Sequence, residues 1–181
     1  METPELKLAQ IVSMPFAENT YVAHLEGRSD CVVFDPGLEP DKIFDYIAAQ
    51  GLQPAALVNT HGHADHIAGN GELKERWPDC PLVIGVNDAP LLTDPRLNLS
   101  RQFGTDLISP AADQTLADGD TFQAGGLELQ AFEIPGHSPG HLVLIWRGGS
   151  PYYVFGGDVL FAGSIGRTDF PGGSFERLEA G

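Results

Sequence analysis

The sequence predicts a single α/β domain, and three observations support this prediction. At 181 residues the chain is long enough for one domain with a sizeable core and too short for two ordinary ones. Between residues 31 and 59 an apolar strand, an amphipathic helix and a second apolar strand follow one another. The second strand runs directly into a group of histidines, and α/β sheets place their chemistry at the carboxyl ends of strands. We therefore expect one domain over residues 1–181 with a site at a sheet edge.

The N-terminal part is predicted to begin with a β-hairpin. Residues 6–14 and 20–26 are apolar-rich segments joined by a turn that contains proline and asparagine. Residues 31–34 are wholly apolar and predict a third strand, which a proline and a glycine then end. Asp35, in the turn that follows, either forms the turn or lies near a metal site, and the sequence slightly favours the turn.

Two helices are predicted next. Residues 39–50 place apolar side chains at helical spacing, with a proline near the start and Gly51 just past the end. Residues 55–59 predict the strand against which this helix packs. A second helix is predicted to begin near His66 and to continue through residue 76, just ahead of Pro78.

The remaining chain predicts strands separated by turns. Residues 82–84, 127–134, 142–146 and 152–155 are apolar or alternating runs bounded by glycine, proline and aspartate. Residues 87–107 are predicted to be irregular because prolines and a glycine interrupt them. A long irregular segment of this kind either lines a cleft or forms a plain surface connection.

Composition and charge narrow the classes of function. Hydrophobic residues make up 42% of the chain and charged residues 19%, which is typical of a globular protein. The formal net charge of −15 disfavours a nucleic-acid partner, because such partners need a basic stripe. No apolar run approaches the roughly 20 residues that span a bilayer.

The predicted location is cytoplasmic. The acidic start, Met1 to Glu5, lacks the basic flank and apolar core of a signal peptide. The two cysteines, Cys31 and Cys80, are far apart and form no C-x-x-C pattern, so neither a disulfide framework nor a cysteine-based zinc site is indicated.

A dense group of metal-ligand residues follows the strand at 55–59. His61, His63, Asp65 and His66 lie within six residues. In an extended segment residues two apart share a face, so His61 and His63 point the same way, and a turn brings Asp65 and His66 behind them. Neutral imidazole suits zinc, iron and similar metals, and a carboxylate ligates a metal or orients its water. The density of ligands favours a metal site over unrelated histidines.

Three further candidates follow later strands. His137 comes after a proline and a glycine and is predicted to project into the site as a metal ligand. His141 opens the next strand and is predicted to hydrogen-bond a ligand from behind. Asp158 follows two glycines, which allow close approach, and it is the natural carboxylate to bridge two metal ions. His24, alone in the hairpin, is predicted to be structural.

These motifs resemble the metallo-β-lactamase fold superfamily, and within it the glyoxalase II branch, the hydroxyacylglutathione hydrolase-like proteins. The resemblance rests on the H-x-H-x-D-H motif at residues 61–66, the P-G-H-S-P-G-H run at 135–141 and the segment from Gly157 to Gly173. It implies a four-layer αββα sandwich with the site along one edge of the two sheets.

The resemblance also implies a dinuclear centre. By motif position His61, His63 and His137 hold the first metal, Asp65 and His66 hold the second, and Asp158 bridges them. The two divalent ions are expected to be zinc, with iron or manganese as alternatives. Such a pair, about 3.5 to 4 Å apart, generates hydroxide near neutral pH, which Asp65 is expected to orient for attack on a thioester carbonyl.

The sequence departs from the family pattern near its end. Family members carry a further histidine on the second metal, and a further strand and helix, whereas no histidine follows His141 here. We therefore expect a sandwich without its final strand and helix, and an open sheet edge that favours self-association. From the resemblance we also expect the domain to lack the glutathione-binding C-terminal extension of glyoxalase II. Arg167 is expected either to bind a substrate carboxylate or to form a salt bridge with Asp169 or another structural acid.

Three functional hypotheses follow. The first is a metal-dependent hydrolase of small-molecule thioesters of the acylglutathione type. The second is the related sulfur (persulfide) dioxygenase, which uses a single iron ion; His61, His137 and Asp158 could supply its facial triad of ligands. The third is a metal-binding fragment with weak catalytic activity.

Overall fold

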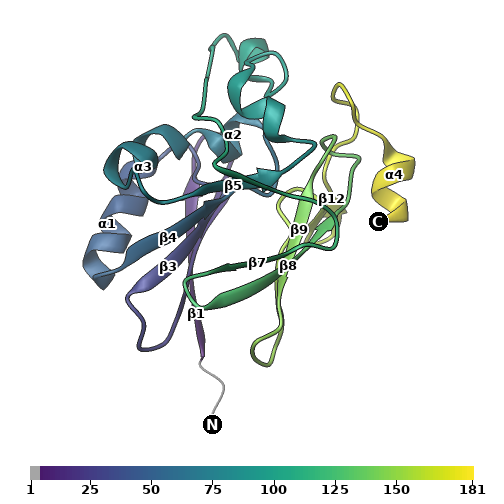
Figure 1. The fold of residues 1–181 in the computed structure, drawn as a ribbon. Helices are drawn as coiled ribbons and strands as arrows, with labels where there is room; N and C mark the ends of the chain where they lie inside the picture. The colour runs from purple at the N-terminus through teal and green to yellow at the C-terminus, as the bar shows by residue number, and fades with distance from the viewer. Residues whose placement is uncertain (1–4) are drawn as a thin grey trace.

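The computed structural model describes residues 5–181 and consists of two packed β-sheets with helices on the outside (Figure 1). The predicted absence of a signal peptide concerns mainly residues 1–4, which lie outside the described residues. No helix within residues 5–181 has the length and apolar character needed to cross a membrane. The predicted α/β class is confirmed.

The first sheet has six strands in chain order, from β1 at one edge to β6 at the other. Its strands are β1 (Leu6–Ser13), β2 (Glu18–Leu25), β3 (Asp30–Phe34), β4 (Gln53–Val58), β5 (Leu82–Gly85) and β6 (Gln114–Leu116). The first three strands pair antiparallel, and β3 to β6 pair parallel. Phe34 pairs with Val58, and this register brings the chain after β3 beside the chain after β4, where the histidines begin.

The second sheet is antiparallel, with strand order β10-β9-β8-β7. Its strands are β7 (Thr121–Ala124), β8 (Leu127–Glu133), β9 (Leu142–Trp146) and β10 (Tyr153–Phe155), and a separate small hairpin pairs β11 (Leu160–Phe161) with β12 (Ser164–Ile165). Strand β10 is an outer strand of this sheet. Self-association through that edge stays a prediction.

The helices flank the sheets on two sides. They are α1 (Pro40–Gln50), α2 (Ala64–Ile67), α3 (Asn70–Arg76) and α4 (Phe175–Ala180), with 3-10 helices η1 (Ala89–Thr93) and η2 (Ser100–Phe103). Figure 1 shows α1 and α3 on the outer face of the first sheet and α4 on the far side of the second. One apolar cluster lies between α1, α3 and the first sheet, and a second lies between the two sheets. In the second, the rings of Phe34 and Phe155 stack with centroids 3.8 Å apart.

Most predicted elements are found within one to three residues of their expected ends, but three expectations need correction. The expected helix from His66 to residue 76 is two helices, because the N–H of Gly69 donates to the Pro36 carbonyl (2.8 Å) and the chain breaks there to pack on the turn after β3. The short strands β6, β7, β11 and β12 were not predicted. Residues 87–107 are not wholly irregular, since η1 and η2 lie within them.

Candidate metal centre

The candidate ligands come from the strand ends of both sheets. His61 and His63 lie in the loop after β4, and α2 then carries Asp65 and His66. From the second sheet, His137 lies in the loop between β8 and β9, His141 directly precedes β9, and Asp158 follows β10. All five of these histidines are buried. The fold therefore brings every predicted ligand to one place.

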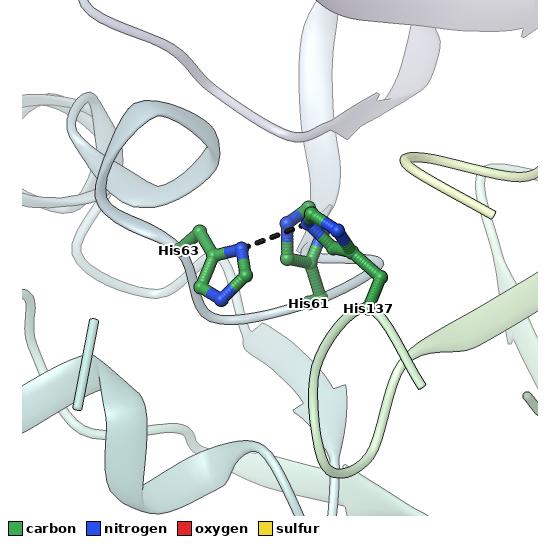
Figure 2. A group of neighbouring side chains, drawn as sticks. All are labelled: His61, His63 and His137. Atoms are coloured by element: carbon green, nitrogen blue, oxygen red, sulfur yellow. Dashed lines mark hydrogen bonds between the residues drawn. The ribbon is translucent and has the colours of Figure 1, made fainter. Parts of the chain in front are cut away.

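One cluster consists of His61, His63 and His137, each of which offers a ring nitrogen within 4.8 Å of the others. Figure 2 shows the three rings converging, and its dashed line marks the hydrogen bond between His63 and His137. Nδ1 of His63 lies 2.9 Å from Nε2 of His137. Nε2 of His61 is buried and has no hydrogen-bond partner. A buried nitrogen without a partner is costly, so this geometry fits a bound metal ion.

Hydrogen bonds behind the rings fix which nitrogens face the cluster. Nδ1 of His137 donates to the Arg167 carbonyl (2.8 Å), which leaves Nε2 unprotonated. Nδ1 of His61 donates to the Thr60 hydroxyl (3.1 Å), which itself donates to Asp35 (2.7 Å). Because Nδ1 carries the proton in both rings, each Nε2 presents a lone pair, as a metal ligand must.

A second cluster consists of His61, His66 and Asp158. The two carboxylate oxygens of Asp158 face different histidines: Oδ1 is 3.4 Å from Nε2 of His66, and Oδ2 is 3.4 Å from Nε2 of His137. Asp65 belongs to neither cluster of atoms, and its carboxylate lies 3.9 Å from Nε2 of His66. Asp158 thus lies between His66 and His137, one from each cluster, whereas Asp65 is close to His66 only.

His141 hydrogen-bonds the main chain of Asp158, and its ring stacks on that of His61 with centroids 4.6 Å apart. Its Nδ1 donates to the Leu142 carbonyl (3.0 Å), and its Nε2 accepts from the N–H of Asp158 (3.0 Å). Burial lowers the pKa of His141 to about 3, so the ring is neutral and can accept this bond. Gly157 has φ +45°, and a Cβ there would lie 2.8 Å from the His141 ring, so the approach requires glycine.

Asp35 is both a turn residue and a neighbour of the site. Its φ of +47° lies in the left-handed region, which aspartate tolerates better than most residues. Its carboxylate accepts from the N–H of Thr60 (2.7 Å) and lies 3.2 Å from Nδ1 of His66. Burial lowers the pKa of His66, but the carboxylates of Asp158 and Asp35 outweigh burial and hold that pKa well above its usual value. Asp35 therefore has both of the roles that the sequence allowed, because it forms the turn and also lies beside the candidate metal ligand His66.

Arg167 forms the salt bridge that was one of its two predicted interactions. Its guanidinium donates to both carboxylate oxygens of Asp169 (2.6 and 2.7 Å) and lies 4.1 Å from the ring centroid of Phe170. The side chain is 59% exposed. Contact with substrate stays a prediction, while the carbonyl of Arg167, which sequence reasoning missed, orients His137.

A cavity of about 1220 Å³ opens beside the second cluster. Asp65, His66 and Asp158 are among its lining residues, which also include the carboxylates of Glu18 and Glu179 and apolar side chains such as Phe155. Its lining residues include no lysine or arginine. A small organic molecule in this cavity would therefore lie beside His66 and Asp158 of the candidate metal centre.

Buried histidines beside part-buried carboxylates, at the strand ends of two packed sheets, form an arrangement that could hold metal ions. The family model of the metallo-beta-lactamase superfamily matches residues 14–181. The chain belongs to the metallo-beta-lactamase superfamily, a superfamily of metallo-hydrolases, as the sequence motifs predicted.

Two relatives that are similar in sequence to this chain are named as hydrolases. It is 38% identical to the "Probable metallo-hydrolase YqgX" of Bacillus subtilis, over 91% of this chain and 76% of that protein. It is 31% identical to the hydroxyacylglutathione hydrolase GloC of Haemophilus influenzae, over 84% of this chain and 72% of that protein.

The solved structures of similar fold include proteins with different names. The BLEG-1 B3 metallo-beta-lactamase superposes with a TM-score of 0.90 at 32% identity, covering 96% of this chain and 82% of that one. A di-iron-bound form of TTHA1623 gives 0.78 at 32%, covering 95% and 82%. ETHE1 from Myxococcus xanthus gives 0.74 at 27%, covering 95% and 66%. These similarities confirm the metallo-beta-lactamase fold. They do not identify the substrate, which has to be inferred from the residues of the site.

Proposed function

We propose that the protein is a metal-dependent hydrolase of small-molecule thioesters of the acylglutathione type, and that it binds two divalent metal ions. The observation that supports this most directly is the Asp158 carboxylate, whose two oxygens face two different groups of histidines. The hydroxyacylglutathione hydrolase among the relatives supports the thioester substrate class.

In this proposal each residue has a definite role. His61, His63 and His137 would hold the first metal, His66 and Asp65 would hold the second, and Asp158 would contribute a carboxylate oxygen to each site. When bound, the two ions would lower the pKa of a shared water and polarise the substrate carbonyl. Asp65 lines the cavity, so its carboxylate is placed to orient the attacking water, while Thr60 and the Arg167 carbonyl keep the proton of His61 and His137 on Nδ1.

Zinc is the first choice of metal, and iron or manganese are alternatives. Imidazole and carboxylate ligands suit all three ions. The di-iron form of TTHA1623 makes iron a serious alternative. A single iron held by His61, His137 and Asp158, as in the dioxygenase hypothesis, would leave His63 and His66 without a role, although both contribute nitrogens to the clusters. This favours the hydrolase.

The test measures metal content and activity on one preparation of the protein. We expect about two metal ions per chain and hydrolysis of an acylglutathione thioester. His137→Gln should lose both metal and activity, because it removes a ring nitrogen from the first cluster. His24→Gln is the matched control: His24 lies in β2 and only its Nδ1 contacts a main-chain carbonyl (3.3 Å), so this variant should keep both.

Three results would count against the proposal. One iron ion per chain, together with oxygen consumption when a persulfide is supplied as substrate, would favour the dioxygenase. Hydrolysis of a β-lactam without thioester hydrolysis would favour the activity named for BLEG-1. Less than one metal per chain with no activity would favour a metal-binding fragment of weak activity.

A further inference from the structure

Asp88 connects the two loops that carry the candidate ligands, although no sequence motif singled it out. It follows β5, and its side chain is fully buried. Oδ2 of Asp88 accepts from the N–H of Gly62 (3.0 Å) and from the hydroxyl of Ser138 (2.7 Å), and Oδ1 accepts from the N–H of Gly140 (2.6 Å). One carboxylate thus receives three hydrogen bonds.

Two of the three donors are direct neighbours of candidate ligands in the sequence, and the third, Gly140, lies in the same loop as His137. Gly62 lies between His61 and His63, and Ser138 directly follows His137. The loops that contain them are far apart along the chain, since His63 and His137 are separated by 74 residues. Asp88 belongs to a third segment, and it fixes the main chain of one loop relative to the other.

The packing around Asp88 leaves little room for adjustment. A Cβ on Gly140 would lie 2.5 Å from the Cβ of Asn87 and 2.8 Å from the main-chain nitrogen of Asp88. A Cβ on Gly62 would overlap the Leu91 side chain. The segment that contains Asp88 therefore packs directly against the main chain of both ligand loops, with glycine required at each contact.

We propose that Asp88 is a positioning residue that sets the separation of His63 from His137, and through it the affinity and geometry of the first metal site. This inference rests on the metal centre of the proposed function. A carboxylate suits the role because it only accepts hydrogen bonds, and all three groups that face it donate. An amide in its place would present its NH₂ group to one of these donors.

The test compares Asp88→Asn with the wild-type protein, using metal binding in place of activity. We expect the affinity for Zn²⁺, measured by competition with a chromophoric chelator, to fall about ten- to hundredfold, as is typical when the partners that orient ligands are lost. At saturating Co²⁺ the visible absorption spectrum should also change, because it reports the ligand geometry. Asp113→Asn is the control: its carboxylate accepts from the Leu82 N–H (2.8 Å) on the first sheet, and both readouts should match wild type.

Each outcome bears on the proposal. A folded Asp88→Asn protein with wild-type Zn²⁺ affinity and Co²⁺ spectrum would overturn it and leave Asp88 as an ordinary structural residue. If that variant does not fold, Ser138→Ala removes one of the three hydrogen bonds and keeps the carboxylate. A changed Co²⁺ spectrum in Ser138→Ala would then support the proposal, and an unchanged one would overturn it. A wild-type protein that binds no metal would instead refute the proposed function.

Discussion

Substitution of Thr60 by valine tests whether the hydrogen bonds behind the first cluster prepare it for a metal. Valine has nearly the shape of threonine, so the change removes one hydroxyl from a residue that is 1% exposed. That hydroxyl donates to Oδ2 of Asp35 (2.7 Å) and accepts from Nδ1 of His61 (3.1 Å). Without it, the proton of His61 has no acceptor on that side.

The magnitude follows from these two contacts. A hydrogen bond to a charged group contributes about 1.5 to 3 kcal/mol, and a buried donor left without a partner costs about 1 kcal/mol or more. We therefore expect the free energy of unfolding of the metal-free protein to fall by about 3 kcal/mol. Because the His61 proton is then free to move to Nε2, Zn²⁺ affinity should fall about ten- to hundredfold.

The assays are urea unfolding of metal-free protein and chelator competition for Zn²⁺. Ser100→Ala is the matched control, because Ser100 is equally buried and its hydroxyl accepts from the Leu107 N–H (3.1 Å). It should lose stability, by about 1 kcal/mol, with no change in Zn²⁺ affinity. A Thr60→Val protein whose Zn²⁺ affinity is within twofold of wild type would refute the idea that Thr60 orients His61.

Two other predictions concern packing and pH. Phe155→Ala should lower the free energy of unfolding by about 3 to 5 kcal/mol, since it removes the ring that stacks on Phe34 between the sheets. The control is Val154→Ala, at a side chain that is 59% exposed, which should change the free energy of unfolding by less than about 0.5 kcal/mol. Equal losses for the two variants in urea unfolding would contradict this packing. Burial raises the pKa of Glu18 from 4.5 to about 8, so the folded metal-free protein holds this proton more tightly than the unfolded chain and loses stability as pH rises from about 4.5 to 8. Glu18→Gln should remove that part of the loss, and an unchanged profile of unfolding free energy against pH would show that Glu18 does not titrate there.

The sequence predicted what depends on local pattern. His61, His63 and His66 were found because they cluster directly after an apolar strand, and His137 and Asp158 because glycines precede each of them at a strand end. The paired sheets followed from the family resemblance. The ends of most strands followed from alternating apolar residues and turn residues.

The groups that orient the ligands were not predictable in the same way. Asp35 contacts Thr60 across 25 residues of sequence, and Asp88 contacts Ser138 across 50. A single aspartate in a turn gives no sign of such a partner, because the contact depends on strand register and loop packing. The Arg167 carbonyl is a main-chain group, so no side-chain pattern marks it. The break between α2 and α3 likewise arises from a tertiary contact, at Gly69.

The division of the ligands between the two sheets has a consequence for folding kinetics. The first sheet and its loops contain His61 and His63, whereas His137 and Asp158 come from the second sheet, and the closing contact joins residues 74 apart. Contacts of such long range form late, because the entropy of the intervening chain must be lost first. A nascent or refolding chain should therefore gain tight metal binding only when the two sheets dock, so that the rate of metal capture reports the final closure of the sandwich.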